Sequence, residues 1–550
     1  MKKILFCTGL CALLFSSCCN NKKCDVKQQN EEENIMGFVK VPLKVDLSGL
    51  KEDEKQMLIY LCDAAEIMDR IYWKEAFNGD KKEFLAGIKN DTLRKYAEIN
   101  YGPWARLDEN KAFLPNFESK PLGANFYPVD MTTTEFDAWK EPLKTSPYTV
   151  IRRDEQGKLK VMWYHEIFKA EVEQAAVLLE KAAGLASNAE FKNYLNLRAK
   201  ALRTDDYYES DLAWMNVKNS PFDFVIGPIE SYEDALNGYK ASHESFLLIK
   251  DTAWSKKLDK FAAMLPDLQK NLPVEAKYKK DMPGLESDMN VYDVVLYRGD
   301  CNAGSKTIAI NLPNDERVHV RKGTRKLQLK NAMKVKFDKI VLPISQLVID
   351  PNQQKMISFD AFFENVTFHE VAHGMGVKKT ISGKGTVRQA LKECYSTIEE
   401  AKADIMGLYL VDRLYNMGEL SEGDLNNNYI TFFAGIFRSV RFGAASAHGK
   451  ANMLCFNYFA DHGVFERKAN GIYTVNVEKM KLAVVSLMGE ILKIQAEGDY
   501  EGLQKWISEK SVVNADLQKD LDRIAAAKIA KDIYFEQGKE VLGLVPVKTK

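Results

Sequence analysis

The hydrophobic positions along the chain follow two periods, one typical of helices and one typical of strands. Apolar residues recur at i, i+3 and i+4 through four long segments and again from Phe359 to about Gln537, which predicts amphipathic helices. Clusters of β-branched residues predict strands in the region between them. The four helical segments are 51–72, 82–99, 165–203 and 251–264. The predicted strands are Val291–Tyr297, Thr307–Leu312 and Lys339–Ile349.

A polar, proline-containing stretch at 266–289 interrupts this pattern and indicates a lobe boundary or an exposed loop. We therefore expect a predominantly helical α+β protein with two lobes. Residues 37–345 would form a mixed α/β lower lobe that carries substrate-binding segments. Residues 346–550 would form a mainly helical catalytic lobe, whose C-terminal part could return to the lower lobe.

Composition narrows the class of protein. The 550 residues are 46% hydrophobic and 28% charged, which excludes a disordered or fibrous chain. Lys and Arg together number 77, as do Asp and Glu, and the mean hydropathy is −0.31. This balance argues against a nucleic-acid-binding protein and against a membrane protein with several spans. The sequence predicts a soluble globular protein.

The first 36 residues read as a targeting segment and a tether. Lys2 and Lys3 precede the apolar run Ile4–Phe15, and Ser-Ser-Cys18 follows. This order resembles a bacterial lipoprotein signal, 1–17, with lipidation of Cys18. Residues 18–36 would be a flexible tether. The expected localisation is the cell envelope, with the membrane contacted through the lipid anchor only. The alternatives are lipidation at Cys19 or an ordinary secretory signal.

Four cysteines remain in the body of the chain, and none of them forms a CxxC pair. We expect them to be small buried residues rather than metal ligands. They are Cys62, Cys301, Cys394 and Cys455.

The strongest chemical signal is His369-Glu370-Val-Ala-His373, an HExxH motif inside an apolar-periodic stretch. On a helix, His369 and His373 lie one turn apart on one face, so both imidazoles can bind a single Zn²⁺. Glu370 lies beside the metal, where it can take a proton from the bound water. The alternative is a pair of histidines on a buried structural helix.

A catalytic zinc needs a third protein ligand. One family of zinc peptidases supplies a further His in HExxHxxGxxH, but Lys379 occupies that position here. The next predicted helix carries Glu399, Glu400 and Asp404 instead. We expect Glu400 on the metal, with Glu399 and Asp404 accepting hydrogen bonds from the outer N–H groups of the histidines. The alternative is a solvated acidic face paired with Lys402.

These residues resemble the dipeptidyl-peptidase III family of zinc peptidases, which pairs a zinc helix with a downstream EExxA(E/D) helix. Three further segments between residues 225 and 465 resemble that family. They are Gly227-Pro-Ile-Glu-Ser-Tyr232, Ala309-Ile-Asn-Leu-Pro-Asn314 and Ala447-His448. The resemblance implies two lobes around a wide cleft, a β-barrel core in the lower lobe, and one Zn²⁺ in the helical upper lobe.

The resemblance also implies roles for single residues. Glu230, Glu244, Asn311 and Asn314 would bind an oligopeptide, the carboxylates at its free ammonium group and the amides along its backbone. His448 or Tyr232 would act in catalysis by donating to the oxyanion. Each has a plain structural alternative. These are a surface turn for Glu230 and Tyr232, turn residues around Pro313 for the asparagines, and an ordinary core or surface histidine for His448.

The zinc motif departs from the family in one respect, because the family usually has HExxxH and this chain has HExxH. The expected function is a zinc-dependent exopeptidase that releases N-terminal dipeptides by Glu-assisted attack of zinc-bound water. The alternatives are a peptide-binding lipoprotein with a structural zinc, or a zinc aminopeptidase or oligopeptidase of another specificity.

Overall fold

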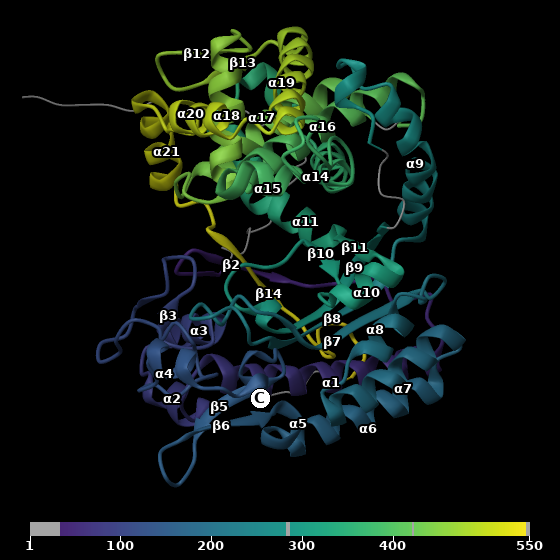
Figure 1. The fold of residues 1–550 in the computed structure, drawn as a ribbon, viewed down its shortest axis with the longest axis vertical. Helices are drawn as coiled ribbons and strands as arrows, with labels where there is room; N and C mark the ends of the chain where they lie inside the picture. Colours follow the sequence, from purple (N-terminus) through teal and green to yellow (C-terminus); the bar gives the residue numbers. More distant parts are fainter. Residues whose placement is uncertain (1–32, 282–286, 421–422, 546–550) are drawn as a thin grey trace, which may run out of the picture.

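The computed structural model describes residues 33–281, 287–420 and 423–545. The described chain is a mostly helical α+β structure built around two large hydrophobic cores, one in each half. In Figure 1 the C-terminal helices form the upper half, the N-terminal helices form the lower half, and the main sheet lies between them. The predicted fold class and the division into two halves agree with this arrangement.

Helices α1, α6 and α7 form the base of the lower half, with α1 against the main sheet. The long helix α1 (Glu52–Ala76) buries an almost continuous apolar face, from Met57 to Ile71. Helices α6 (Lys169–Leu185) and α7 (Ala189–Thr204) come from the segment predicted as one helix, 165–203. The smaller helices of this half are α2 (Lys81–Gly87), α3 (Asp91–Asn100), α4 (Thr133–Ala138), α5 (Tyr164–Ile167), α8 (Tyr208–Trp214) and α10 (Glu316–Lys322).

The main sheet has five strands in the order β10-β11-β9-β8-β7. Strand β11 pairs in parallel with β9, and the other neighbours are antiparallel. Their bounds are β7 Phe222–Glu230, β8 Ser242–Lys250, β9 Ser287–Gly299, β10 Ala309–Leu312 and β11 Thr324–Leu329. The strands predicted at 291–297 and 307–312 are therefore confirmed. Because β10 and β7 are free edges, no sheet in the described residues closes into a barrel, and the expected β-barrel is not confirmed.

The strand predicted at Lys339–Ile349 is wrong. This segment forms a π-helical turn, Phe337–Val341, followed by α12 (Leu342–Val348). Ile340, Ile344 and Val348 recur at helical spacing and are all buried. A short apolar run cannot be assigned by periodicity alone, and burial in the upper core outweighs the weak preference of β-branched residues for strands.

The upper half is a helical assembly around α14 (Phe359–His373) and α16 (Tyr395–Asn416). Around this pair lie α17 (Leu425–Val440), α18 (Ala447–Asp461) and α19 (Val477–Glu497). The shorter elements are α11 (Lys330–Lys336), α13 (Pro351–Gln354), α15 (Val387–Leu391), α20 (Tyr500–Lys510), α21 (Ala515–Ala526), β12 (Phe465–Arg467) and β13 (Tyr473–Val475).

The predicted boundary between the lobes at residue 345 needs a correction at α9, whereas the C-terminal part returns to the lower half as the prediction allowed. Helix α9 (Thr252–Lys270) belongs to the upper half, because its Phe261 packs on Phe368 of α14 at 5.5 Å between ring centroids. Strand β14 (Asp532–Glu536) returns to pair with β2 (Phe38–Pro42) near the lower half. Hydrophobic periodicity reports an element's type, whereas the half that it joins is decided by tertiary packing.

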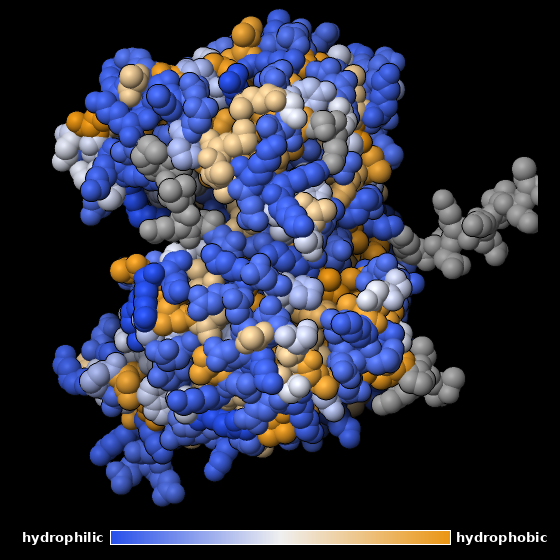
Figure 2. Space-filling model, turned by 90° about the vertical axis from the view of Figure 1, so that its right-hand side faces the viewer, coloured by the Kyte–Doolittle hydropathy of each residue, from blue (hydrophilic) through white to orange (hydrophobic). Residues whose placement is uncertain are grey.

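The predicted signal, 1–17, with Cys18, and most of the predicted tether lie outside the described residues. The end of the tether is corrected, because Asn34–Ile35 form β1 and pair with β2. Among the described helices, none combines the length and the apolar character needed to cross a bilayer. The four body cysteines are buried, as predicted, and none of them forms a disulfide within the described residues. Figure 2 shows a largely hydrophilic face with a notch along one edge between the two halves.

Candidate functional site

Helices α14 and α16 cross at very close range and bring the two sequence motifs together. Ser358 caps the start of α14 by accepting a hydrogen bond from the Ala361 N–H. At the crossing, α16 presents Gly407, where an added Cβ would lie 2.7 Å from the backbone nitrogen of His369. Only a glycine permits this separation. The contact sets the position of the α16 carboxylates relative to the α14 histidines.

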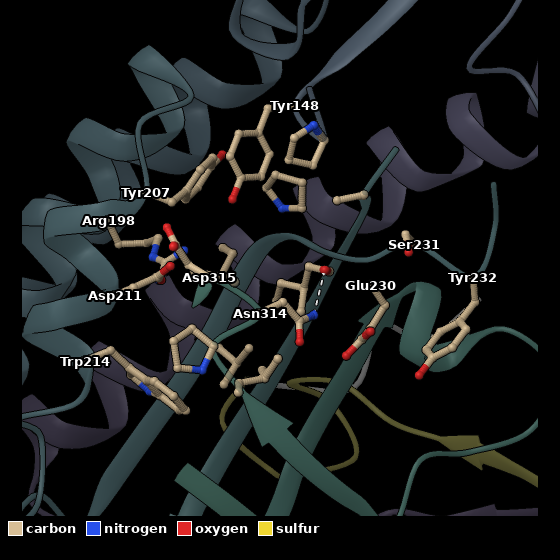
Figure 3. A pocket seen from close by; sticks show the side chains of 18 of the residues that line it. Tyr148, Arg198, Tyr207, Asp211, Trp214, Glu230, Ser231, Tyr232, Asn314 and Asp315 are labelled. Atoms are coloured by element: carbon tan, nitrogen blue, oxygen red, sulfur yellow. Dashed lines mark hydrogen bonds and ion pairs between the residues drawn. The ribbon is translucent and has the colours of Figure 1, made fainter. Parts of the chain in front are cut away.

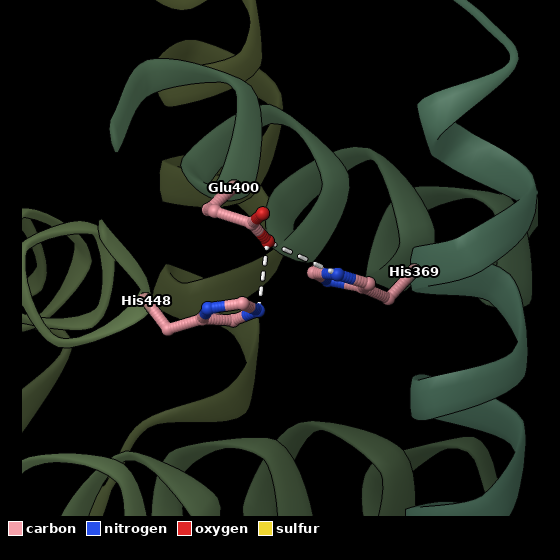
Figure 4. A group of neighbouring side chains, drawn as sticks. All are labelled: His369, Glu400 and His448. Atoms are coloured by element: carbon pink, nitrogen blue, oxygen red, sulfur yellow. Dashed lines mark ion pairs between the residues drawn. The ribbon is translucent and has the colours of Figure 1, made fainter. Parts of the chain in front are cut away.

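One carboxylate oxygen is the centre of the site. The Oε2 atom of Glu400 lies 3.1 Å from Nε2 of His448, 3.3 Å from Nε2 of His369 and 3.8 Å from Nε2 of His373. The Nε2 atoms of His369 and His373 are 3.2 Å apart. Figure 4 shows Glu400 between His369 and His448, whose rings point toward its carboxylate from α14 and α18. This oxygen is buried, and no group in the described part of the chain forms a hydrogen bond with it.

The donor set fits a divalent metal ion. Donors placed about 2.0–2.2 Å from one ion in a tetrahedral array lie about 3.3–3.6 Å apart, and the observed separations of 3.1–3.8 Å are close to this. Imidazole nitrogens with one carboxylate oxygen are typical zinc ligands. His369, Glu400 and His448 form a group whose ligand atoms all lie within 4.8 Å of one another.

The Nδ1 atoms of His369 and His373 each have a carboxylate partner, which distinguishes these two histidines from His448. Asp404 Oδ1 lies 2.7 Å from His369 Nδ1, and Glu399 Oε1 lies 3.1 Å from His373 Nδ1. Carboxylates in this position orient a metal-binding histidine and increase its basicity. Among the described residues, His448 Nδ1 has no such partner, and its side chain is 65% exposed. The contacts expected of Glu399 and Asp404 are present.

The local charges favour a cation between the two helices. Burial lowers the pKa of the His369 imidazole, but hydrogen bonds to Asp404 and Glu400 outweigh burial and raise this pKa to about 10. Burial raises the pKa of the Glu399 carboxyl, but His373 and Lys402 outweigh burial and bring it to about 2. Lys402 is itself buried and donates to Glu399 and to the Met375 carbonyl. The acidic residues of α16 are therefore not a solvated surface face.

A cavity of about 240 Å³ opens beside these groups. His369, Glu370 and His448 line it, and so do Ile308 and Ala309 at the start of β10. It therefore lies between the upper helices and the edge of the main sheet, as expected for a site between two lobes.

The main sheet also reaches the helix that carries Glu370. Lys326 of β11 donates a 2.7 Å hydrogen bond to the Glu370 backbone carbonyl, and its Nζ lies 3.9 Å from the Glu370 carboxylate. Asn452 of α18 donates to Asp404 at 3.1 Å. Sequence reasoning missed both residues. Asn452 lies four residues after His448 and could have been found by helical spacing, whereas nothing in the sequence marks Lys326.

A second cavity, of about 410 Å³, lies in the lower half and contains two of the predicted substrate-binding residues. Figure 3 shows Glu230 and Asn314 at this cavity, with Asn314 donating to the Ile229 carbonyl at 3.0 Å. Burial raises the pKa of the Glu230 carboxyl, and the Asn314 amide partly offsets this. Tyr232 lines the same cavity with its side chain largely exposed. It does not line the cavity that contains His369.

Glu244 and Asn311 lie outside this lower cavity's lining. Glu244 is on β8, is only 3% exposed, and has its pKa raised well above the ordinary value by burial and by Asp300. Its carboxyl lies behind the cavity lining, close enough to Glu230 and Tyr232 for their charges to interact, and the substrate-binding role of Glu244 stays a prediction. Asn311 is exposed on β10, opposite Lys326 of β11.

The contact at Gly407 leads to a first prediction. Gly407→Ala will push α14 and α16 apart and destabilise the fold by about 1–3 kcal/mol. It will also weaken metal binding, because the donors come from both helices. Thermal unfolding with and without added zinc measures both effects. Gly184→Ala on α6 is the matched control, since a Cβ there meets nothing within 4 Å. Unchanged zinc affinity in Gly407→Ala would contradict the prediction.

Two solved structures have an overall fold similar to that of this chain. The structure of DPP III from Caldithrix abyssi superposes with a TM-score of 0.88 at 39% identity, covering 92% of this chain and 99% of that one. The structure of dipeptidyl-peptidase III from Corallococcus sp. strain EGB gives 0.75 at 37% identity, covering 91% and 95%. The sequence profile of Peptidase family M49 matches residues 134–386.

Two characterised sequences are also similar. Nudix hydrolase 3 from Arabidopsis thaliana is 34% identical over 567 residues, which cover 91% of this chain and 73% of that protein. Human dipeptidyl peptidase 3 is 27% identical over 195 residues, 35% of this chain and 24% of the human protein.

Fold, donor set and relatives together define a metallopeptidase. The chain belongs to Peptidase family M49, the dipeptidyl-peptidase III family, as the sequence motifs predicted.

Proposed function

We propose that this metallopeptidase is a zinc-dependent exopeptidase that removes dipeptides from the free N-terminus of oligopeptides. The observation that carries the proposal is the convergence of three imidazoles on Glu400, next to a cavity that His369, His448 and Glu370 line. The two solved structures that resemble the chain over more than 90% of its length are described as DPP III enzymes, which supports dipeptide release.

His369, His373 and Glu400 would hold the zinc, since Asp404 and Glu399 orient the two histidines from behind. When bound, zinc polarises a peptide carbonyl and makes water more acidic. Glu370 would take a proton from the attacking water and deliver it to the leaving amine. His448 would donate to the oxyanion, because it is exposed at the same cavity. Tyr232 lines the other cavity, so it would donate to the oxyanion only if the two halves moved closer together.

The peptide would lie along β10. This strand is the free edge of the main sheet, so its backbone can pair with an extended peptide. Asn311 and Asn314 follow this edge and supply amide donors and acceptors. Glu230, in the lower cavity, would hold the ammonium group at the end of the peptide. A fixed distance between Glu230 and the zinc site would set the length of the released fragment.

Binding of the ammonium group leads to a second prediction. N-acetylation of a tetrapeptide will lower kcat/KM by about 10- to 100-fold, because the charge-assisted contact with Glu230 is lost. Glu230→Gln will lower the rate on the free peptide and reduce the effect of acetylation. Steady-state kinetics on the matched peptides with both proteins measure this. If the parent protein hydrolysed the free and the acetylated peptide at equal rates, it would not be an exopeptidase that recognises the free N-terminus.

Product length separates the proposed function from its rivals. We would incubate peptides of four to eight residues with zinc-loaded protein and identify the products by mass spectrometry. Dipeptides from the N-terminus support the proposal. Single residues or internal cuts would retain the metallopeptidase and reject dipeptide release. An absence of cleavage would favour a protein that binds peptides unchanged.

We also propose, on the sequence of residues 1–36 alone, that the protein is a cell-envelope lipoprotein attached through Cys18. Metabolic labelling with a fatty acid in a bacterial host will label the parent and not Cys18→Ala. Labelling that persists in Cys18→Ala and is lost in Cys19→Ala would move the anchor by one residue.

A further inference from the structure

Arg438 of α17 carries a guanidinium that forms no hydrogen bond and no close ion pair with any other described residue. The Arg438 side chain is half-buried. Its guanidinium lies 6.0 Å from the centroid of the Phe362 ring. Burial lowers the pKa of Arg438, and Asp532 and Asp404 offset this only in part, without a direct contact. Three residues later, Arg441 donates to the carbonyls of Ala530 and Lys531. Since a buried charge without a partner is costly, Arg438 is suited to an anion that the protein itself does not provide.

The Arg438 side chain lines the same 240 Å³ cavity as His369, Glu370 and His448. The rest of the lining includes apolar side chains, among them Phe362 and Phe432. These apolar side chains lower the local dielectric constant, which strengthens an ion pair at Arg438. An anion bound there would lie next to the groups that cleave the peptide bond.

The course of β10 indicates which end of a peptide would reach Arg438. Ile308 and Ala309, at its start, line the cavity with Arg438, and Leu312 and Asn314, at its end, line the lower cavity with Glu230. A peptide held along β10 by its ammonium group at Glu230 therefore extends its C-terminal side into the Arg438 cavity. The four residues of β10 span about 13 Å, the length of an extended tetrapeptide.

We propose that Arg438 binds the free C-terminal carboxylate of tri- and tetrapeptide substrates, which makes the enzyme selective for short peptides. This inference rests on the proposed function. Arg438 would be a second charged anchor beside Glu230, so that both ends of a short peptide are bound and the scissile bond lies between them. Guanidinium and carboxylate can form two parallel hydrogen bonds, which fix the leaving fragment in orientation.

A rival role is available to Arg438. It lies near Asp404, the carboxylate that orients His369, and its charge could act on that pair instead. That role is structural and would affect every substrate equally, whereas binding of a carboxylate affects only substrates that carry one.

The test compares one tetrapeptide with its C-terminal amide, on the zinc-loaded parent and on Arg438→Met. For the parent we expect kcat/KM to be about 10- to 100-fold lower on the amide. Arg438→Met should lower the rate on the free acid to about that on the amide and leave the amide rate nearly unchanged. Arg438→Lys should restore part of the difference. Arg70→Met is the matched control, because the Arg70 guanidinium donates to Gln174 on the exposed surface of the lower half.

Each outcome decides the inference. Equal rates of the parent on the acid and the amide would overturn it and leave the proposed function intact, since both peptides would be cleaved. Equal losses on both peptides in Arg438→Met, with zinc content retained, would assign Arg438 to Asp404 and also overturn it. The comparison of acid with amide on the parent needs no variant, so a folding defect cannot obscure it. Failure to cleave any peptide would remove the proposed function and this inference together.

Discussion

Glu370→Gln will lower kcat for peptide hydrolysis by about 10²- to 10⁴-fold while the fold and bound zinc are retained. Glu370 lines the cavity beside His369 and His448 and is not among the groups that converge on Glu400 Oε2. Loss of a general base costs about this factor. The amide keeps the size of the side chain, so the contact of Lys326 with the Glu370 backbone carbonyl can remain. Single-turnover kinetics measure the loss of the hydrolysis rate, and metal analysis measures the retained zinc.

Glu501→Gln provides the control, because this glutamate lies in α20, away from the cavity, and is exposed. If Glu370→Gln cleaved peptides at the parental rate, Glu370 would have no part in the chemistry. If neither protein cleaved peptides but both bound them with the same affinity, the zinc would be structural and the protein a peptide-binding one.

Glu400→Ala will lower zinc affinity by well over about 100-fold and abolish hydrolysis. Loss of a residue that merely orients a ligand costs about 10- to 100-fold in metal affinity, and Glu400 contributes the oxygen on which three imidazoles converge. Removal of the carboxylate will leave those imidazoles without the charge that balances a bound cation. Competition with a chelator measures the affinity, and zinc-dependent thermal stabilisation checks it independently.

Glu399→Gln and Asp404→Asn are graded controls for that experiment. They keep the donors of the zinc site and change only the partners of His373 and His369, so their losses should be smaller than that of Glu400→Ala. If Glu400→Ala retained zinc as well as these variants do, His448 would be the third ligand instead. The position of His448 Nε2, 3.1 Å from Glu400, makes this the alternative to exclude.

The metal-binding motif could be predicted because its residues have a characteristic spacing within single helices. His369 and His373 are one helical turn apart, and so are Glu400 and Asp404 on the next long helix, with Glu399 adjacent to Glu400. Helical periodicity brings such residues together whatever else the chain does. The prediction of a strand at Lys339–Ile349 failed for the opposite reason. Its apolar run fits a strand or a helix equally well, and packing in the upper core decided in favour of a helix.

Residues outside the motifs could not be found in this way. Glu244 resembles a substrate-binding residue in sequence, but β8 buries it beside Asp300. Lys326 and Arg438 carry no motif, and each matters only because a distant element lies against it. Helix α9 lies in the half opposite to the one that the predicted boundary gave it, since packing against a distant helix decides its place.

By itself, the sequence determined the helical α+β class, the metal-binding pattern of residues and the family, because these depend on residue type and spacing along single elements. Only the tertiary structure decided that α16 meets α14 at Gly407, that Glu400 lies among three imidazoles, and that the edge of the main sheet borders the same cavity. The physical reason is that these contacts join residues far apart in the chain. Their distances follow from how whole elements pack and not from any local pattern.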